Sequence, residues 1–289
     1  MTLLNLAGIE PAFFIVFSLC LGLIVGSFLN VVIHRLPKMM ESEFRHECAV
    51  IDLPEGAEEP ARPRYNLAVP RSACPGCGAL ITARDNVPVL SWLWLRGRCR
   101  HCQTAISPRY PLVELATGLL TAAMAWHFGP SLLAVGAILL VWFLVALFCI
   151  DADTYLLPDS LTLPLLWLGL LFNLNGIFVP LQDAVIGAMA GYLLLWLVYW
   201  AFKLVTGKDG MGYGDFKLLA ALGAWMGWQC LPVIILMSSV AGAIIGISLT
   251  LLARRGWGKP LPFGPYLAIA GLATLFWGPQ LQRLIWGAY

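Results

Sequence analysis

Long apolar runs, separated by short polar segments, occupy most of this chain. A helix needs about 20 mainly apolar residues to cross a lipid bilayer, and eight runs reach or approach that length. They cover residues 11–33, 111–127, 131–150, 160–179, 184–205, 214–229, 231–253 and 263–286. The second and sixth runs are short. The pattern predicts an all-α polytopic membrane protein with about eight transmembrane helices.

Basic residues distinguish the two sides of this predicted membrane protein. The segments on one side, with the adjoining helix ends, hold every lysine and arginine except Arg283. These segments are 34–110, 151–159, 206–213 and 254–262, and the loops on the other side hold no basic residue. Because lysine and arginine accumulate in cytoplasmic loops, we expect the four basic segments to face the cytoplasm.

The composition supports the same class of protein. Of the 289 residues, 60% are hydrophobic and 12% are charged, whereas a soluble domain has about 25% charged residues. A lipid bilayer is therefore the expected environment, and we expect no nucleic-acid partner. The net charge of +2 says little, because the distribution of the charges matters more. Since no lysine or arginine precedes the first apolar run, we expect that run to be kept as a membrane helix rather than removed as a signal peptide.

One sizeable polar segment interrupts the apolar runs. We expect residues 1–33 to contain the first transmembrane helix, residues 34–110 a small cytoplasmic domain inserted between helices 1 and 2, and residues 111–289 the membrane core. Within the polar segment, residues 41–64 are acidic, contain three prolines and lack an apolar period. Such a composition predicts a flexible excursion.

Four cysteines in the cytoplasmic domain form two close pairs. The motif CPGCG contains Cys74 and Cys77, and CRHC contains Cys99 and Cys102. Two Cys-x-x-Cys pairs about 20 residues apart are typical of a tetrahedral zinc site, and four sulfur ligands favour a structural role for the metal. The spacing also permits iron, or four free or redox-active thiols, and His101 is an alternative ligand.

Two aspartates lie where predicted helices meet the cytoplasm. Asp151 ends the third helix, in LFCIDADTYLLPDSLT, and Asp215 begins the sixth, after GMGYG. Two carboxylates in one low-dielectric site can share a proton, so one can act as general base for a water and the other as general acid. Such a pair hydrolyses peptide bonds without a metal. The three glycines before Asp215 predict close approach of an extended substrate, and positive φ angles.

Neighbouring acidic residues have simpler interpretations. Asp159 follows Pro158 and can cap the fourth helix, while Asp153 can be a solvated residue at the membrane interface. A capping role alone would explain Asp215, but it would not explain the three glycines before it. Acidic residues at membrane helices also mark ion paths, so an ion-coupled transporter that uses the same aspartates is an alternative.

Several motifs together resemble one family. The stretch GMGYGDFKLLAALGAWMG resembles the GxGD signature of the type IV prepilin peptidases. The stretch DADTYLLPD resembles their first aspartate motif, in which an Asp precedes a Pro-Asp pair by seven residues. GSFLNVVIHRLP, the two cysteine pairs and RYPLVELATG also match, in the expected order over nearly the whole chain. The chain is therefore similar to bifunctional leader peptidases and N-methyltransferases of the bacterial inner membrane.

The resemblance implies a reaction and a substrate. Members of the family remove the short basic leader of prepilins and pseudopilins, subunits of type IV pili and type II secretion systems, after a glycine at the cytoplasmic face. They then methylate the new N-terminal residue, usually phenylalanine, with S-adenosylmethionine. By motif match, the resemblance assigns catalysis to Asp151 and Asp215 and the peptidase to residues 111–289. A peptidase that has lost methylation is an alternative, which the cysteine-bearing loop disfavours.

The resemblance also points to residues associated with methylation. The stretch LRGRC matches a Gly followed by a basic residue, here Gly97 and Arg98, where relatives commonly have Lys. Arginine keeps the charge but changes the hydrogen-bond geometry. Glu114, just inside the second helix, is a candidate both for the methylation site and for a buried structural partner. No Gly-rich cofactor loop of the soluble type is present, so the site for S-adenosylmethionine stays unassigned.

Overall fold

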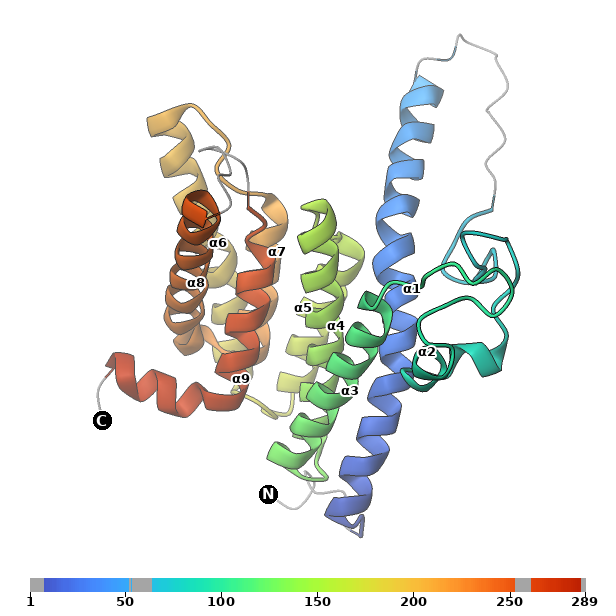
Figure 1. Cartoon of the computed structure of the whole chain (residues 1–289). Coiled ribbons are helices and arrows are strands. Elements are labelled where there is room, and N and C mark those ends of the chain that lie inside the picture. Colours follow the sequence, from blue (N-terminus) through green and yellow to red (C-terminus); the bar gives the residue numbers. More distant parts are fainter. Residues whose placement is uncertain (1–7, 52, 54–63, 253–260, 287–289) are drawn as a thin grey trace. The chain divides into compact units, whose positions relative to one another are not determined.

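The computed structural model describes residues 8–51, 53, 64–252 and 261–286 (Figure 1). Its eight longest helices each overlap one predicted run: α1 (Pro11–Ile51), α3 (Arg109–Phe128), α4 (Leu132–Thr154), α5 (Asp159–Asn173), α6 (Leu181–Thr206), α7 (Tyr213–Met226), α8 (Leu231–Leu252) and α9 (Gly264–Trp286). The fourth run is predicted to reach residue 179, but α5 ends at Asn173. Short helical segments also occur: η2 (Ala83–Asn86), α2 (Leu90–Trp94) and η3 (Trp228–Cys230). Over these described residues the chain forms no β-strand, only isolated bridges. The all-α prediction is confirmed.

Among the described residues, four stretches are long and apolar enough to cross a membrane. They are α1, α4, α6 and Trp228–Ser248, which combines η3 with most of α8. α5 has 15 residues and α7 has 14, so each spans about 22 Å, less than the hydrocarbon core of about 30 Å. The structure supports a membrane protein with four candidate spans, and the number of eight stays a prediction.

The first helix is longer than predicted. The sequence predicts an end at residue 33 and irregular structure from residue 41, but α1 continues to Ile51. Residues 38–51 contain no glycine or proline, and Arg45 pairs with Glu41 one turn earlier at 2.5 Å, a spacing that stabilises helices. The predicted end of the helix is therefore wrong, as is the irregular structure expected for 41–51. Residues 52 and 54–63 of the predicted excursion lie outside the described residues.

The chain forms two compact units, which we call the N-terminal unit (Ile15–Ala123) and the C-terminal unit (Met1–Phe14 with Met124–Tyr289). Within the N-terminal unit, small residues bring α1 and α3 into contact. A Cβ atom on Gly22 would lie 2.6 Å from the Thr121 hydroxyl oxygen, and one on Gly26 would lie 2.7 Å from the Cα of Glu114. Small residues let membrane helices approach closely, so this helix pair depends on glycine.

In the C-terminal unit, the short helix α7 packs against α5, α6 and α9. Nearly all of its side chains are buried, which explains how a helix of 14 residues is stable there. A Cβ on Gly187 of α6 would lie 2.3 Å from the carbonyl oxygen of Gly223 on α7, and one on Gly191 would lie 2.7 Å from that of Leu219. The backbones of α6 and α7 therefore touch.

Polar side chains fix the C-terminal end of α7. Trp225 is fully buried, and its indole N–H donates to the carbonyl of Leu165 at 2.8 Å. The amide of Asn173 donates to the carbonyl of Ala224 at 2.9 Å, and its oxygen accepts from the N–H of Phe178 at 3.0 Å. The bond to Ala224 satisfies a carbonyl that the end of α7 leaves unpaired. Together the bonds hold α7 in a fixed position relative to α5.

Replacing Gly187 with alanine is expected to destabilise the C-terminal unit, because the new methyl group would overlap the backbone of Gly223. Overpacking of this kind costs about 1–3 kcal/mol. Thermal unfolding of the detergent-purified protein would measure the loss. Gly278→Ala is the matched control, since a Cβ there would meet no atom closer than 3.9 Å. Equal Tm values for the two variants would contradict the close contact.

Candidate active site and metal centre

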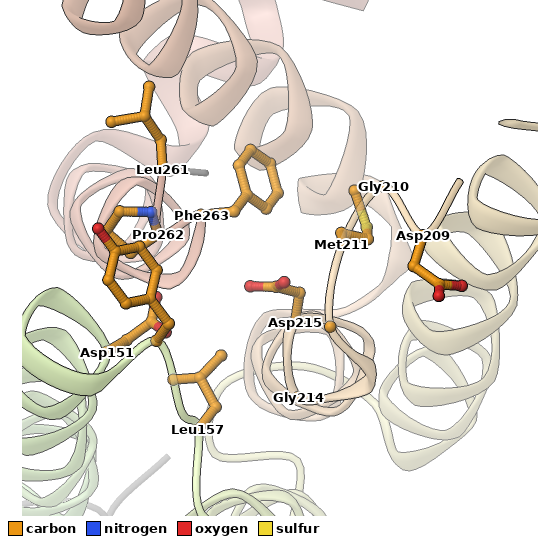
Figure 2. A pocket seen from close by; sticks show the side chains of 12 residues that line it. Asp151, Leu157, Asp209, Gly210, Met211, Gly214, Asp215, Leu261, Pro262 and Phe263 are labelled. Atoms are coloured by element: carbon orange, nitrogen blue, oxygen red, sulfur yellow. The ribbon is translucent and has the colours of Figure 1, made fainter. Parts of the chain in front are cut away.

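A cavity of about 430 Å³ lies in the C-terminal unit, where α4 ends and α7 begins (Figure 2). Its walls come from the end of α4 and the loop after it, the glycine-rich segment before α7, the first turn of α7, and the segment that leads into α9. The lining residues are Asp151, Tyr155, Leu157, Asp209, Gly210, Met211, Gly212, Gly214, Asp215, Leu261, Pro262 and Phe263. Both aspartates singled out in the sequence therefore line one cavity.

Asp151 lies in the last turn of α4 and is 4% exposed. Its Oδ2 accepts a hydrogen bond from the N–H of Gly264, at the start of α9, at 2.9 Å. A Cβ on Gly264 would lie 2.6 Å from that oxygen, so a larger residue would displace the carboxylate. Tyr155 ends α4 in the left-handed conformation and donates its backbone N–H to the carbonyl of Asp151. The Asp151 residue is thus held at its backbone and at its carboxylate.

Asp215 lies in the first turn of α7 and is 7% exposed. The helix begins after Gly212, and the helix dipole at this end favours an anion. Asp151 lines the same cavity, so a charge on it disfavours a second charge on Asp215. The Oδ1 atom of Asp215 is buried and has no hydrogen-bond partner in the described part of the chain. Buried polar atoms are nearly always bonded, so this oxygen is available to a water or a substrate group.

The glycines before Asp215 act through their size and not through positive φ angles. The sequence predicts positive φ, but Gly210, Gly212 and Gly214 all have ordinary backbone angles, so that prediction is wrong. A Cβ on Gly214 would lie 2.6 Å from the Cβ of Leu157, whereas one on Gly212 would meet nothing closer than Asp215 Oδ2 at 3.9 Å. Gly214 thus lets the two walls of the cavity meet, and Gly212 leaves the space beside Asp215 open.

Asp209 attaches the glycine-rich segment to α6. Its Oδ1 accepts a hydrogen bond from the Tyr199 hydroxyl at 2.6 Å and pairs with Lys203 Nζ at 2.8 Å. The Lys203 hydrogen bond holds the pKa of Asp209 below its usual range. Asp209 was not among the residues singled out from the sequence, although it directly precedes the first glycine of GMGYGD.

The other two aspartates of DADTYLLPD do not line the cavity. Asp153 is exposed, and Asp159 lies in the first turn of α5. The N-cap of α5 is Pro158, and no side chain caps the helix, so the capping interpretation of Asp159 is wrong. Both of its carboxylate oxygens instead accept hydrogen bonds from Lys217 Nζ, at 2.6 and 2.7 Å. This ion pair joins the start of α5 to α7, two residues after Asp215.

In the N-terminal unit, four cysteine side chains form one cluster. The Sγ atoms of Cys74, Cys77, Cys99 and Cys102 all lie within 4.8 Å of one another, and those of Cys74 and Cys102 are 3.7 Å apart. Four sulfurs bound to zinc at about 2.3 Å define a tetrahedron with edges of about 3.8 Å. The size and chemistry of this donor set therefore fit zinc.

Each cysteine pair lies on the same kind of backbone turn. The carbonyl of Cys74 accepts a hydrogen bond from the N–H of Gly78 at 2.9 Å, and that of Cys99 accepts one from the N–H of Gln103 at 3.1 Å. Gly78 and Gln103 both have positive φ angles, 70° and 58°. The repeated turn points the two sulfurs of each pair toward the other pair.

Ionisation of the thiols differs across the cluster. Hydrogen bonds from Thr104 lower the pKa of Cys102 to about 6, which favours the thiolate form that binds metals. For Cys77, the backbone N–H of Ala79 acts to lower the pKa, but the neighbouring thiols outweigh it and raise the pKa to about 11. The cluster therefore holds protons that a bound metal ion would displace.

The residues associated with methylation have structural contacts. Gly97 has a φ of 68°, and a Cβ there would lie 2.8 Å from the indole ring of Trp92 in α2. Arg98 is exposed. Glu114 is buried, and its Oε2 accepts a hydrogen bond from the N–H of Val89, the N-cap of α2, at 2.7 Å. Gly97 and Glu114 therefore both hold α2, which agrees with the structural interpretation of Glu114.

Comparisons with known proteins agree on one family. Residues 20–128 match the model of the bacterial peptidase A24 N-terminal domain, and residues 138–247 match that of the type IV leader peptidase family. A prepilin leader peptidase/N-methyltransferase of Aeromonas hydrophila is 60% identical over 283 residues, which cover 97% of each chain. Proteins of the same name from Stutzerimonas stutzeri and Pseudomonas aeruginosa are each 55% identical; the matches cover 97% and 98% of this chain and 96% and 97% of theirs. No solved structure matches the chain.

Proposed function

Since the chain belongs to the type IV leader peptidase family, we propose that it removes the basic leader of prepilins and pseudopilins after a glycine and then N-methylates the new N-terminal residue. Cleavage takes place in the cavity that Asp151 and Asp215 line. The observation that carries this proposal is the pair of buried carboxylates on one cavity, where Asp215 Oδ1 has no partner among the described residues.

The two aspartates act as an acid–base pair. The ionised carboxylate takes a proton from a water molecule, whose oxygen attacks the carbonyl carbon of the last glycine of the leader. The protonated carboxyl donates its hydrogen to the carbonyl oxygen. As the C–N bond breaks, the proton taken from water passes to the leaving amine, and one hydroxyl of the tetrahedral intermediate returns its proton to the second carboxylate. Burial supports this sharing of one proton, because two nearby carboxylates in a low-dielectric site do not both ionise readily.

The shape of the cavity suits an extended peptide. Gly212 leaves space beside Asp215, so a substrate backbone can approach the carboxylate without meeting a side chain. Apolar walls formed by Leu157, Leu261 and Phe263 suit the phenylalanine that follows the cleaved bond. The exposed carboxylate of Asp209 also lines the cavity, and its negative charge suits the basic leader.

Methyl transfer and metal binding belong to the N-terminal unit in this proposal. Zinc held by Cys74, Cys77, Cys99 and Cys102 connects the two turns and has a structural role, because four sulfurs leave no open position. S-adenosylmethionine supplies the methyl group. Gly97, Arg98 and Glu114 are its candidate contacts by family pattern alone, since the contacts of Gly97 and Glu114 with α2 already account for those two residues.

The proposed location is the bacterial inner membrane, with all eight long helices crossing the bilayer. The basic segments between them then face the cytoplasm. In this arrangement the cavity opens toward the cytoplasmic side, where the leader of a prepilin is found. Asp151 lines it at the end of α4, and Asp215 lines it at the start of α7. Reporter fusions to the loops between helices, read on both sides of the membrane, would test the number of spans.

A peptide assay tests the function directly. Purified full-length protein in detergent is incubated with a substrate that carries a basic leader, a glycine and then phenylalanine, with and without S-adenosylmethionine. We expect cleavage after the glycine in both samples and one added methyl mass only with the cofactor. Cleavage without an added methyl mass would indicate a peptidase that lacks methyltransferase activity. No cleavage, together with ion flux in proteoliposomes, would indicate a transporter instead.

The ion pair of Asp159 and Lys217 is expected to position Asp215 without taking part in the reaction. Exposed pairs of this kind contribute about 0–1 kcal/mol, so Lys217→Met should lower the cleavage rate by less than about tenfold, mainly through kcat. The double exchange Asp159→Lys with Lys217→Asp keeps the pair and should restore part of the rate. A loss in Lys217→Met as large as that of Asp215→Asn, with no rescue, would contradict a positioning role.

A further inference from the structure

The short helix α2 presents three large apolar side chains outside the N-terminal unit. Leu90, Leu93 and Trp94 are 63%, 58% and 87% exposed. Trp92, on the same helix, faces the unit: its ring packs on Gly97, and its indole N–H donates to the carbonyl of Ile106 at 3.1 Å. α2 therefore has one side that the unit covers and one apolar side that no described residue of the unit covers.

The contacts of α2 place it beside the part of α1 that crosses the membrane. Its N-cap residue Val89 bonds to Glu114, and Glu114 in turn lies against Gly26 of α1, where a Cβ would be 2.7 Å from the Glu114 Cα. Gly26 lies inside the predicted span of residues 11–33, seven residues or about 10 Å before its end. The predicted span therefore puts the N-cap of α2 at the depth of the bilayer, and Figure 1 draws α2 level with the interior of α1, well before the helix ends.

Side chains on α1 and α3 near this contact are also apolar and exposed. Phe28, two residues after Gly26, is 53% exposed, and Leu112 and Leu115, on either side of Glu114, are also exposed. Such a surface is expected where helices face lipid acyl chains. The uncovered side of α2 therefore lies at the same level as a lipid-facing surface of its own unit.

Exposed arginines follow the apolar side chains of α2. Arg96 and Arg98 come two and four residues after Trp94, and both are exposed. Tryptophan concentrates at the membrane–water interface, and basic residues beside an apolar face bind the phosphates of lipid headgroups. The order of the residues, apolar and then basic, matches the change from acyl chains to headgroups.

We propose that α2 is embedded in the bilayer leaflet nearest the C-terminal end of the α1 span. Leu90, Leu93 and Trp94 lie among the acyl chains, and Arg96 and Arg98 lie at the phosphates. The hydrogen bond from Val89 to Glu114 supports this insertion, because a backbone N–H at that depth must find a partner within the protein. The cysteine cluster is thereby held at the membrane surface.

Fluorine NMR of the full-length protein tests the proposal. The chain has 12 tryptophans; it is labelled with 5-fluorotryptophan and placed in lipid nanodiscs at one copy per disc, with no substrate present. The Trp94 resonance is the one that disappears in Trp94→Phe, and the Trp92 resonance is assigned in the same way. Broadening is then measured with a nitroxide on the lipid headgroup and, separately, with a gadolinium chelate in the water.

We expect the headgroup nitroxide to broaden the Trp94 resonance severalfold more than the chelate does, and more than it broadens Trp92, which faces the unit. A chelate effect on Trp94 as large as the nitroxide effect would place α2 in water and overturn the proposal. Protection of Trp94 from both agents would also overturn it, because another part of the same chain would then cover α2. All readings come from unaltered protein, so the folding of the assignment variants does not limit the test.

Discussion

Asp215→Asn is expected to reduce the rate of leader cleavage by about 10²–10⁴-fold, the usual contribution of a general acid or base. Asparagine has the shape of aspartate but cannot exchange the proton that peptide hydrolysis needs. Because Asp215 Oδ1 has no hydrogen-bond partner in the described part of the chain, the substitution breaks no bond there, and stability should change little. Initial rates of product formation, read by mass spectrometry, measure the effect.

Methylation supplies the internal control for this variant. The aspartates lie in the C-terminal unit, whereas the cysteine cluster and the candidate methylation residues lie in the N-terminal unit. Asp215→Asn should therefore still methylate a peptide that already begins with phenylalanine. A variant that methylates normally and keeps more than about one tenth of the wild-type cleavage rate would contradict an acid–base role.

Loss of the metal is the second large effect that we expect. Cys74→Ser and Cys99→Ser each remove a buried thiol from the cluster, and structural zinc contributes about 10–16 kcal/mol to the folding of small zinc domains. Both variants should fall from about one zinc per chain to almost none. Residues 73–105, which carry the two turns, should then exchange their amide hydrogens rapidly, and methylation should fall more than cleavage.

Cys48→Ser is the matched control, because Cys48 is an exposed cysteine outside the cluster. It should keep its zinc content and its pattern of hydrogen exchange. Metal analysis of the purified protein and hydrogen-exchange mass spectrometry provide the two measurements. Full zinc content in Cys74→Ser would contradict a four-sulfur site, and iron in place of zinc would correct the identity of the metal.

Much of the helical framework was predictable from apolar periodicity and length. Each of the eight predicted runs overlaps a helix, because a run of apolar residues with few polar interruptions has no other way to satisfy its backbone in a membrane. The end of α1 was not predictable from apolar residues alone. Beyond residue 33 the helix continues through polar residues, supported by local pairs such as Glu41 with Arg45.

The candidate aspartates and cysteines could be singled out from the sequence because each lies in a short motif with a fixed local spacing. The partner of Asp151 could not, since Gly264 lies 113 residues away and nothing in its own sequence marks a donor to a carboxylate. The pairing of Asp159 with Lys217 was not predictable either, because it depends on how α5 packs against α7. The need for glycines before Asp215 was predictable, but their role was not. The sequence does not distinguish a glycine that allows a close contact, such as Gly214, from one that adopts a positive φ angle.

The most direct test of the central claim compares Asp151→Asn, Asp153→Asn and Asp215→Asn in one cleavage assay on the purified full-length protein. Asp151 and Asp215 line the cavity, whereas Asp153 is exposed and does not. We predict that the first and third variants lose cleavage while Asp153→Asn cleaves at the wild-type rate. Cleavage by either Asp151→Asn or Asp215→Asn, or its loss in Asp153→Asn alone, would contradict the assignment of the cavity as the peptidase site.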